Sequence, residues 1–152
     1  MKHRKFNKKD FKQIHPAGNL GAQLKTVEDI MLKDNAIPFV SENLKMKDAL
    51  KVLSSKKLGF LLVRDKKKLT KGIITDGELR RFSQKNQNFH NIPVKKIMTK
   101  NPIGIDKNEL AAKALSIMNN KKITSLCVYE KKNKFKTIGV LHIHNILQSN
   151  IS

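Results

Sequence analysis

The feature that most constrains the fold of this 152-residue chain is that part of its sequence occurs twice. Val27-Glu28-Asp29-Ile30-Met31 returns 67 residues later as Val94-Lys95-Lys96-Ile97-Met98. Similarity at a fixed spacing indicates two copies of one supersecondary unit, and a single unit of about 60 residues buries too little apolar surface to be stable alone. We therefore expect the two copies to pack around a pseudo-twofold axis, with clefts between them.

Each copy contains an apolar stripe with the spacing of an amphipathic helix. Apolar residues recur at i, i+3, i+4 and i+7, and a Lys-Lys pair follows each stripe, where we expect the helix to end. The stripes consist of Met46, Ala49, Leu50 and Leu53 in the first copy and of Ala111, Ala114, Leu115 and Met118 in the second.

Two short apolar runs follow each helix and predict two buried strands, the second leading directly into a closing helix. An extended segment that contains a proline precedes each amphipathic helix. The expected strands are 60–63, 72–74, 125–128 and 139–141, the extended segments are 37–40 and 101–105, and the closing helices are 77–83 and 144–148.

The formal net charge of +20 is the most pronounced compositional feature. Such a charge by itself suggests a polyanionic partner such as nucleic acid. However, 28 of the 32 basic residues are lysines, in short clusters at expected turns, and aromatic residues for base stacking make up only 5% of the chain. This pattern favours a solvated lysine surface over a nucleic-acid interface, and it should attract small anionic ligands.

No apolar run approaches the roughly 20 residues that span a bilayer, and the first residues lack the apolar core of a signal peptide. We therefore expect a cytoplasmic protein with no membrane partner. The single cysteine, Cys127, lies in the apolar run Leu126-Cys127-Val128. This position predicts a buried small hydrophobic residue in a reducing compartment rather than a nucleophile or a metal ligand.

The repeated order of strand, helix, strand, strand and helix resembles a tandem CBS domain pair, the Bateman module, over about residues 27–147. The resemblance implies an α/β fold of two βαββα repeats with pseudo-twofold symmetry. We expect a linker arm over 1–26 that carries the end of an isomerase-domain segment, CBS repeat 1 over 27–90 and CBS repeat 2 over 91–152. Such modules commonly pair again, so the resemblance also implies a homodimer.

Two stretches resemble more specifically the C-terminal region of bacterial arabinose-5-phosphate isomerases. One starts with Gly72-Ile73-Ile74-Thr75-Asp76-Gly77-Glu78-Leu79-Arg80-Arg81 and has a counterpart in Gly139-Val140-Leu141-His142-Ile143-His144. The other, His15-Pro16-Ala17-Gly18-Asn19-Leu20-Gly21, is similar to the HPGGxLG segment of those enzymes, with Ala17 in place of the usual glycine.

That resemblance implies an enzyme that interconverts ribulose 5-phosphate and arabinose 5-phosphate for Kdo and lipopolysaccharide biosynthesis. The phosphate-binding serines and acid/base carboxylates of a sugar-isomerase domain do not fit within the first 26 residues, so we expect this chain alone not to be an enzyme. In the family, the histidine that corresponds to His15 belongs to the active site, which implies that His15 is catalytic only with a missing isomerase domain.

Thr75-Asp76-Gly77-Glu78 is the main ligand-binding candidate, because it places a hydroxyl and carboxylates at the start of a helix directly after a strand. A helix N-terminus favours phosphate. The resemblance implies that Thr75 and the acid three residues later hold a ribose, although Glu78 stands where the family has aspartate. The same residues also fit a Thr-x-x-Glu capping box, and the two roles are compatible.

In the second copy, His142 takes the threonine position and Asn145 the carboxylate position, with His144 between them. Their N–H groups suit a sugar phosphate or a carboxylate, or they only cap the strand end. We expect no metal, because two histidines without nearby acids or cysteines fall short of the ligands that zinc needs. Arginine side chains suit a phosphate ligand or a dimer face. Backbone groups and side-chain hydroxyls are further candidates for contact with the ligand. These further candidates are Arg80, Arg81, Thr99, Pro102, Ile103, Thr124 and Ser125.

The sequence therefore predicts a regulatory module in which an anionic nucleotide or sugar nucleotide shifts the activity of an attached catalytic domain. AMP, ATP and CMP-Kdo are the expected regulatory ligands, and no cofactor is expected. Three alternatives remain open: a ligand-free structural dimerisation module, a basic nucleic-acid-binding protein, and the CBS pair of a sugar-nucleotide transferase. The last shares the Thr-Asp-Gly motif but does not account for His15-Pro16-Ala17-Gly18.

Overall fold

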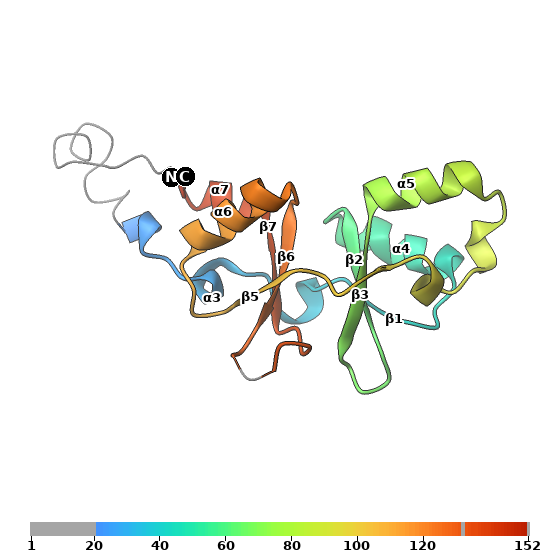
Figure 1. Cartoon of the computed structure of the whole chain (residues 1–152), viewed down its shortest axis with the longest axis horizontal. Coiled ribbons are helices and arrows are strands. Elements are labelled where there is room, and N and C mark those ends of the chain that lie inside the picture. Colours follow the sequence, from blue (N-terminus) through green and yellow to red (C-terminus); the bar gives the residue numbers. More distant parts are fainter. Residues whose placement is uncertain (1–20, 132, 152) are drawn as a thin grey trace. The chain divides into compact units, whose positions relative to one another are not determined.

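The computed structural model describes residues 21–131 and 133–151, which fall into two compact units (Figure 1). Unit 2 contains residues 33–103 and 133–137, and the other described residues form unit 1. Unit 2 thus holds most of the first sequence copy together with residues 94–103 of the second. Unit 1 holds most of the second copy together with residues 27–32 of the first. The opening segment of each copy therefore belongs to the unit built by the other copy.

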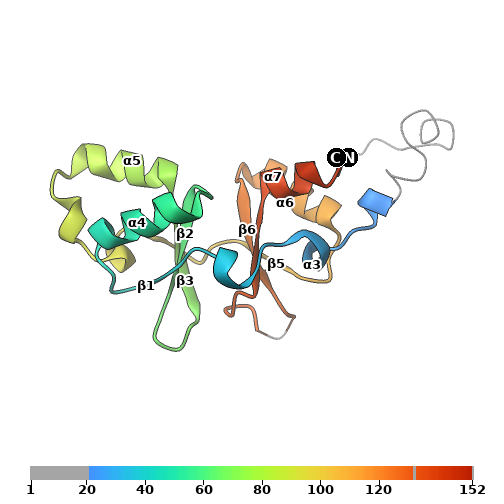
Figure 2. The same cartoon turned by 180° about the vertical axis from the view of Figure 1, so that it is seen from behind.

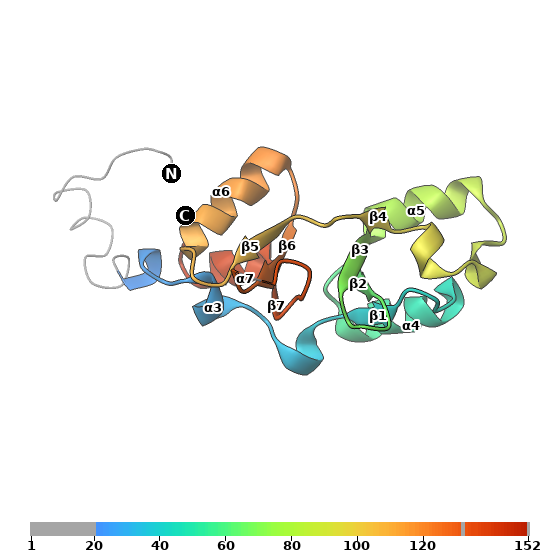
Figure 3. The ribbon, with the colours of Figure 1, turned by 60° about the horizontal axis from the view of Figure 1, so that its bottom comes forward.

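Unit 2 is a four-stranded sheet in the order β1-β2-β3-β4 with two helices beside it (Figure 1 and Figure 2). The first pair of strands is parallel and the other two pairs are antiparallel. Both helices lie on the same face of the sheet (Figure 3). The elements are β1 (Phe39–Ser41), α4 (Met46–Lys56), β2 (Phe60–Arg64), β3 (Thr70–Thr75), α5 (Asp76–Lys85), the 3-10 turns η1 (Asp34–Ala36), η2 (Phe89–Asn91) and η3 (Val94–Lys96), and β4 (Thr99–Lys100).

The core of unit 2 lies between the sheet and its helices. Leu61 and Val63 alternate along β2 and pack against Met46 and Ala49 of α4, which are fully buried. Alternation in the strand and helical spacing in α4 thus bring one apolar face of each element together. Val94 of η3 completes this cluster from the second sequence copy.

Unit 1 is a three-stranded sheet in the order β5-β6-β7, with the parallel and antiparallel pairings of β1-β2-β3 repeated. Leu32 extends its edge by exchanging two backbone hydrogen bonds of 2.9 Å with Val140. The apolar stripe of α6 and the buried Val27 share its core. The elements are α3 (Val27–Ile30), β5 (Gly104–Asp106), α6 (Ala111–Lys121), β6 (Ser125–Tyr129), β7 (Gly139–His142) and α7 (Ile143–Gln148).

The α/β fold of two βαββα repeats is confirmed, and so are the four helices and four strands expected after the opening segments. Both amphipathic helices end at the first lysine of a Lys-Lys pair, because the second lysine, Lys57 or Lys122, adopts a left-handed conformation with φ of 59° or 57°. Cys127 is buried, as expected. None of the helices in the described part of the chain combines the length and apolar character needed to cross a membrane.

Candidate functional site

The junction of β3 and α5 holds a capping box. The Glu78 backbone N–H donates to Thr75 Oγ1 at 3.2 Å, and the Thr75 backbone N–H donates to Glu78 Oε1 at 3.0 Å. The Thr75 hydroxyl also lies 3.0 Å from the same carboxylate oxygen, as its donor. These bonds satisfy backbone donors that a helix start otherwise leaves without partners.

Glu78 is tied to a third candidate residue, Thr99, whose hydroxyl donates to Glu78 Oε2. Thr99 reaches this position because β4 pairs with β3 and places Thr99 opposite Ile73. The structure therefore brings Thr75, Glu78 and Thr99 into one hydrogen-bonded group. Both oxygens of the Glu78 carboxylate already accept hydrogen bonds within it.

Asp76 differs from Glu78 in that its side chain is exposed and, within the described residues, has no hydrogen-bond or ion-pair partner. Its backbone N–H donates to the Gly59 carbonyl at 2.9 Å, which fixes the first turn of α5. Arg80 and Arg81 are exposed one turn later. Arg81 folds back, since a Cβ added to Gly77 would lie 3.5 Å from Arg81 Nη1. The start of α5 thus presents an exposed carboxylate at Asp76, and the Arg81 guanidinium lies over the neighbouring Gly77.

The junction of β7 and α7 repeats this arrangement with different residues. The His142 backbone N–H donates to Asn145 Oδ1 at 3.0 Å, and the His144 backbone N–H donates to His142 Nδ1 at 3.1 Å. Since Nδ1 accepts this bond, the proton of neutral His142 lies on Nε2. Burial, and then the charge of His144, hold the pKa of His142 below its usual value. The two imidazole rings lie 4.6 Å apart between centroids.

Thr124 and Ser125 lie beside His142. Ser125 is buried and pairs with His142 in the β6–β7 register, and the Thr124 carbonyl accepts from the Ile143 N–H at 2.8 Å. In unit 2 the equivalent hydrogen bond runs from the Asp76 N–H to the Gly59 carbonyl. The candidate residues therefore form two groups, one on each unit.

Unit 2 carries Thr75, Asp76, Glu78, Arg80, Arg81, Thr99, Pro102 and Ile103, and unit 1 carries Thr124, Ser125, His142, His144 and Asn145. Ile103 is 39% exposed and Pro102 is half-buried. His15 lies outside the described residues. Within residues 21–131 and 133–151, no three histidine, cysteine or acidic side chains are grouped so that they could hold a metal ion.

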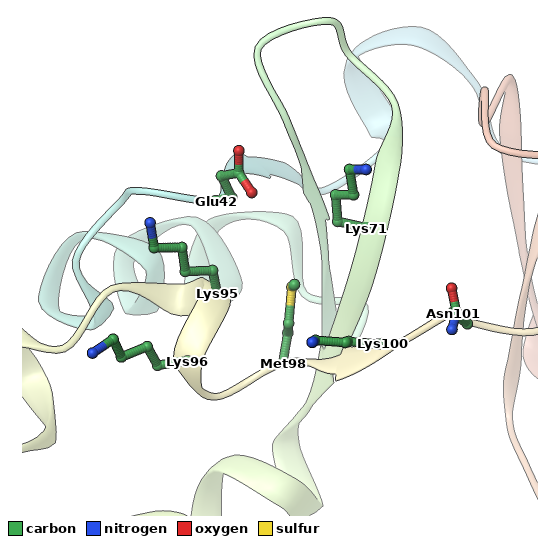
Figure 4. A pocket seen from close by; sticks show the side chains of 7 residues that line it. All are labelled: Glu42, Lys71, Lys95, Lys96, Met98, Lys100 and Asn101. Atoms are coloured by element: carbon green, nitrogen blue, oxygen red, sulfur yellow. The ribbon is translucent and has the colours of Figure 1, made fainter.

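Sequence reasoning missed a pocket of about 540 Å³ on unit 2, which we call the lysine pocket (Figure 4). The composition predicts only a general solvated lysine surface. A signal was nevertheless present, because the repeated segment has Lys95 and Lys96 where the first copy has Glu28 and Asp29. The pocket is lined by Glu42, Lys71, Lys95, Lys96, Met98, Lys100 and Asn101.

Comparison with known families and curated proteins identifies similar sequences. The sequence model of the CBS domain matches residues 27–85 and 94–151. The chain is 35% identical over 152 residues to arabinose 5-phosphate isomerase KdsD of Yersinia pestis, and 37% identical over 149 residues to that of Francisella tularensis. These matches cover 99% and 97% of this chain but 45% of each relative. The chain thus spans less than half the length of the curated relatives it matches.

Solved structures with a similar fold include CBSX2 in complex with AMP, with a TM-score of 0.72 and 24% identity over 82% of this chain and 95% of that one. The CBS domain pair of protein MJ0100, in complex with 5'-methylthioadenosine and S-adenosyl-L-methionine, has a TM-score of 0.71 and 20% identity, over 82% of this chain and 94% of that one. At these identities the likeness establishes the fold.

Proposed function

The chain belongs to the CBS domain family, and on that premise we propose that it is a regulatory module that binds an anionic nucleotide or sugar nucleotide. The observation that carries the proposal is the start of α5, where the exposed Asp76 carboxylate follows a capped strand–helix junction. Support comes from the fold, since similarly folded CBS pairs have been solved with AMP and with S-adenosyl-L-methionine.

In this proposal Asp76, rather than Glu78, receives the hydroxyl groups of a ribose. Glu78 already accepts bonds from Thr75 and Thr99, whereas Asp76 keeps its acceptor capacity. The exposed Arg80 and Arg81 supply a positive charge for phosphate or carboxylate one turn away. On unit 1, the Nε2–H of His142 and the exposed His144 are donors to the same class of ligand.

We further propose that the chain is the C-terminal region of an arabinose-5-phosphate isomerase-like protein that converts ribulose 5-phosphate to arabinose 5-phosphate. The 35% identity to a KdsD enzyme supports this assignment. AMP, ATP and the product-derived CMP-Kdo are then the sensible regulatory ligands, acting in the cytoplasm on a homodimer. A ligand regulates such an enzyme by binding one conformation more tightly than another.

A ligand-free dimerisation module is the second candidate function. The observation that favours it is that Thr75, Glu78 and Thr99 use their polar groups on one another. Side chains that satisfy one another need no ligand to stabilise them. This candidate predicts a dimer that no nucleotide affects.

Calorimetric titration with AMP, ATP and CMP-Kdo at about 150 mM salt separates the two candidates, since salt screens general attraction to lysines. We expect saturable binding of one compound, weakened about tenfold or more by Asp76→Asn. Asp48→Asn, which removes the same charge from the first turn of α4, is the matched control and should leave binding unchanged. A folded dimer that binds none of the three compounds would support the ligand-free module instead.

A further inference from the structure

We propose that the lysine pocket of unit 2 binds a small anion that carries several phosphate groups. Four exposed lysines from three elements line it: Lys71 from β3, Lys95 and Lys96 from η3, and Lys100 from β4 (Figure 4). Lys71 is distant in sequence from the other three and lies on the same pocket because β4 pairs with β3. The pocket is of the size that holds small ligands, which is about 300 to 1,000 Å³.

The charge in this pocket is not balanced by its lining. Glu42 is the only acidic residue among the lining side chains. Lys71 forms an ion pair with Asp65, with 3.6 Å between Nζ and Oδ2. In the described part of the chain, Lys95, Lys96 and Lys100 have no ion-pair partner. Cations held close together repel one another, and a bound polyanion relieves that repulsion.

The first sequence copy provides an internal comparison for Lys95 and Lys96. The corresponding residues are Glu28 and Asp29, both acidic. One backbone contact is shared by the two places, since the N–H of Lys95 donates to the Glu42 carbonyl at 3.1 Å and that of Glu28 to the Lys107 carbonyl at 3.0 Å. The fold therefore accepts either charge at these positions.

Charge is compensated at the corresponding place in unit 1. Lys107, which corresponds to Glu42, forms ion pairs with Glu28 at 3.4 Å and with Glu130 at 3.5 Å. The residue that corresponds to Lys71 is the apolar Ile138. Only the unit 2 version gathers uncompensated cations, so the concentration of charge belongs to this site and not to the repeated fold.

The lining also selects the chemistry of the ligand. Lysine ammonium groups bind phosphate as point charges with three donors each. None of the lining residues is aromatic, so the pocket has no surface on which a nucleobase would stack. Met98 and Lys100 line the pocket, while the hydroxyl of the intervening Thr99 binds Glu78, so this site is separate from the one in the proposed function and does not rest on it.

The test is calorimetric titration of the whole chain with tripolyphosphate and with ATP at about 150 mM salt. We expect saturable binding of both at one shared site, because the phosphates are recognised and the base is not. Lys95→Glu/Lys96→Asp installs the residues of the first copy and should weaken binding about tenfold or more. Lys66→Glu/Lys67→Asp, an equal charge change in the exposed β2–β3 turn, is the matched control and should change affinity less than about twofold.

Two further variants guard against an effect of unfolding. Lys95→Gln/Lys96→Gln removes the charges without reversing them and should also weaken binding. Glu42→Gln removes the single acid of the pocket and should tighten tripolyphosphate binding severalfold, a gain that damage to the fold does not produce. All variants should keep the wild-type thermal transition.

Several results would overturn the inference. One is an absence of saturable tripolyphosphate binding. Another is that the pocket and control double variants weaken tripolyphosphate binding equally. A third is that a single-stranded RNA binds more tightly than tripolyphosphate and that both double variants weaken RNA binding equally. The last result would indicate an extended nucleic-acid surface. Nucleotide binding that depends on Asp76 but not on Lys95 and Lys96 would support the proposed function while removing this site.

Discussion

Met98 packs directly over Gly72, so that a Cβ added to Gly72 would lie 2.6 Å from Met98 Sδ and 2.8 Å from the Thr99 carbonyl. Met31 has the same relationship to Gly139 in unit 1. This one contact explains two features that both sequence copies share. They are the methionine that ends the opening segment and the glycine that begins the apolar run of the second strand. The contact joins the opening segment of one copy to a strand of the other.

Gly72→Ala should therefore destabilise the protein. The added methyl group meets both a side chain and backbone, and overpacking of this kind costs about 1 to 3 kcal/mol. Urea denaturation should show a lower midpoint with an unchanged m-value. Gly21→Ala, where a Cβ meets nothing within 4 Å, is the control. Equal stability of the Gly72 and Gly21 variants would show that Met98 moves aside freely.

Thr75→Ala should lower stability by about 1 kcal/mol through loss of the helix cap. The hydroxyl accepts the Glu78 N–H and also orients the Glu78 carboxylate. Thr75→Ser keeps the hydroxyl and should stay close to wild type. Thermal unfolding of the two variants checks this, and a serine variant as unstable as the alanine variant would assign the effect to the lost methyl group instead.

Periodicity and repetition were sufficient to predict the helices, the strands and the α/β fold, because apolar spacing directly reports which face of an element is buried. They did not predict β4 or the bridge between Leu32 and Val140. The Met98-Thr99-Lys100 segment carries no apolar alternation, and its pairing depends on an edge supplied by the other copy. Local sequence patterns do not contain that information.

The candidate site was predictable only in part. Thr75 and Glu78 were identified as a capping box from their spacing, and that is what they form. The bond from Thr99 to Glu78 follows from the pairing of β4 and was not foreseen. The lysine pocket was missed for the same reason, since Lys71 and Lys95 are brought together by tertiary structure and not by sequence.

Lys57→Gly and Lys122→Gly should each stabilise the protein by up to about 1 kcal/mol. Both lysines hold left-handed conformations at the ends of α4 and α6, which glycine adopts without steric cost. Chemical denaturation should show a higher midpoint for both variants. Lys51→Gly, within α4, is the opposing control and should destabilise by about 1 kcal/mol. A loss of stability at Lys57 equal to that at Lys51 would contradict the argument.

His142 should make stability depend on pH in a way that a threonine at this position does not. Its Nδ1 must be unprotonated to accept the His144 N–H, and burial, followed by the His144 charge, lowers the pKa of His142. Below the ordinary value of 6.5, the unfolded chain therefore binds more protons at this residue than the folded chain does. This contribution to stability is fully present above that pH and is lost as pH falls through the lowered pKa.

His142→Thr supplies a hydroxyl cap like that of Thr75, so its free energy of unfolding should fall less than that of wild type between about pH 7.5 and about pH 5.5. Urea denaturation of both proteins across this range is the measurement, and parallel pH profiles would show that His142 does not titrate differently in the folded state.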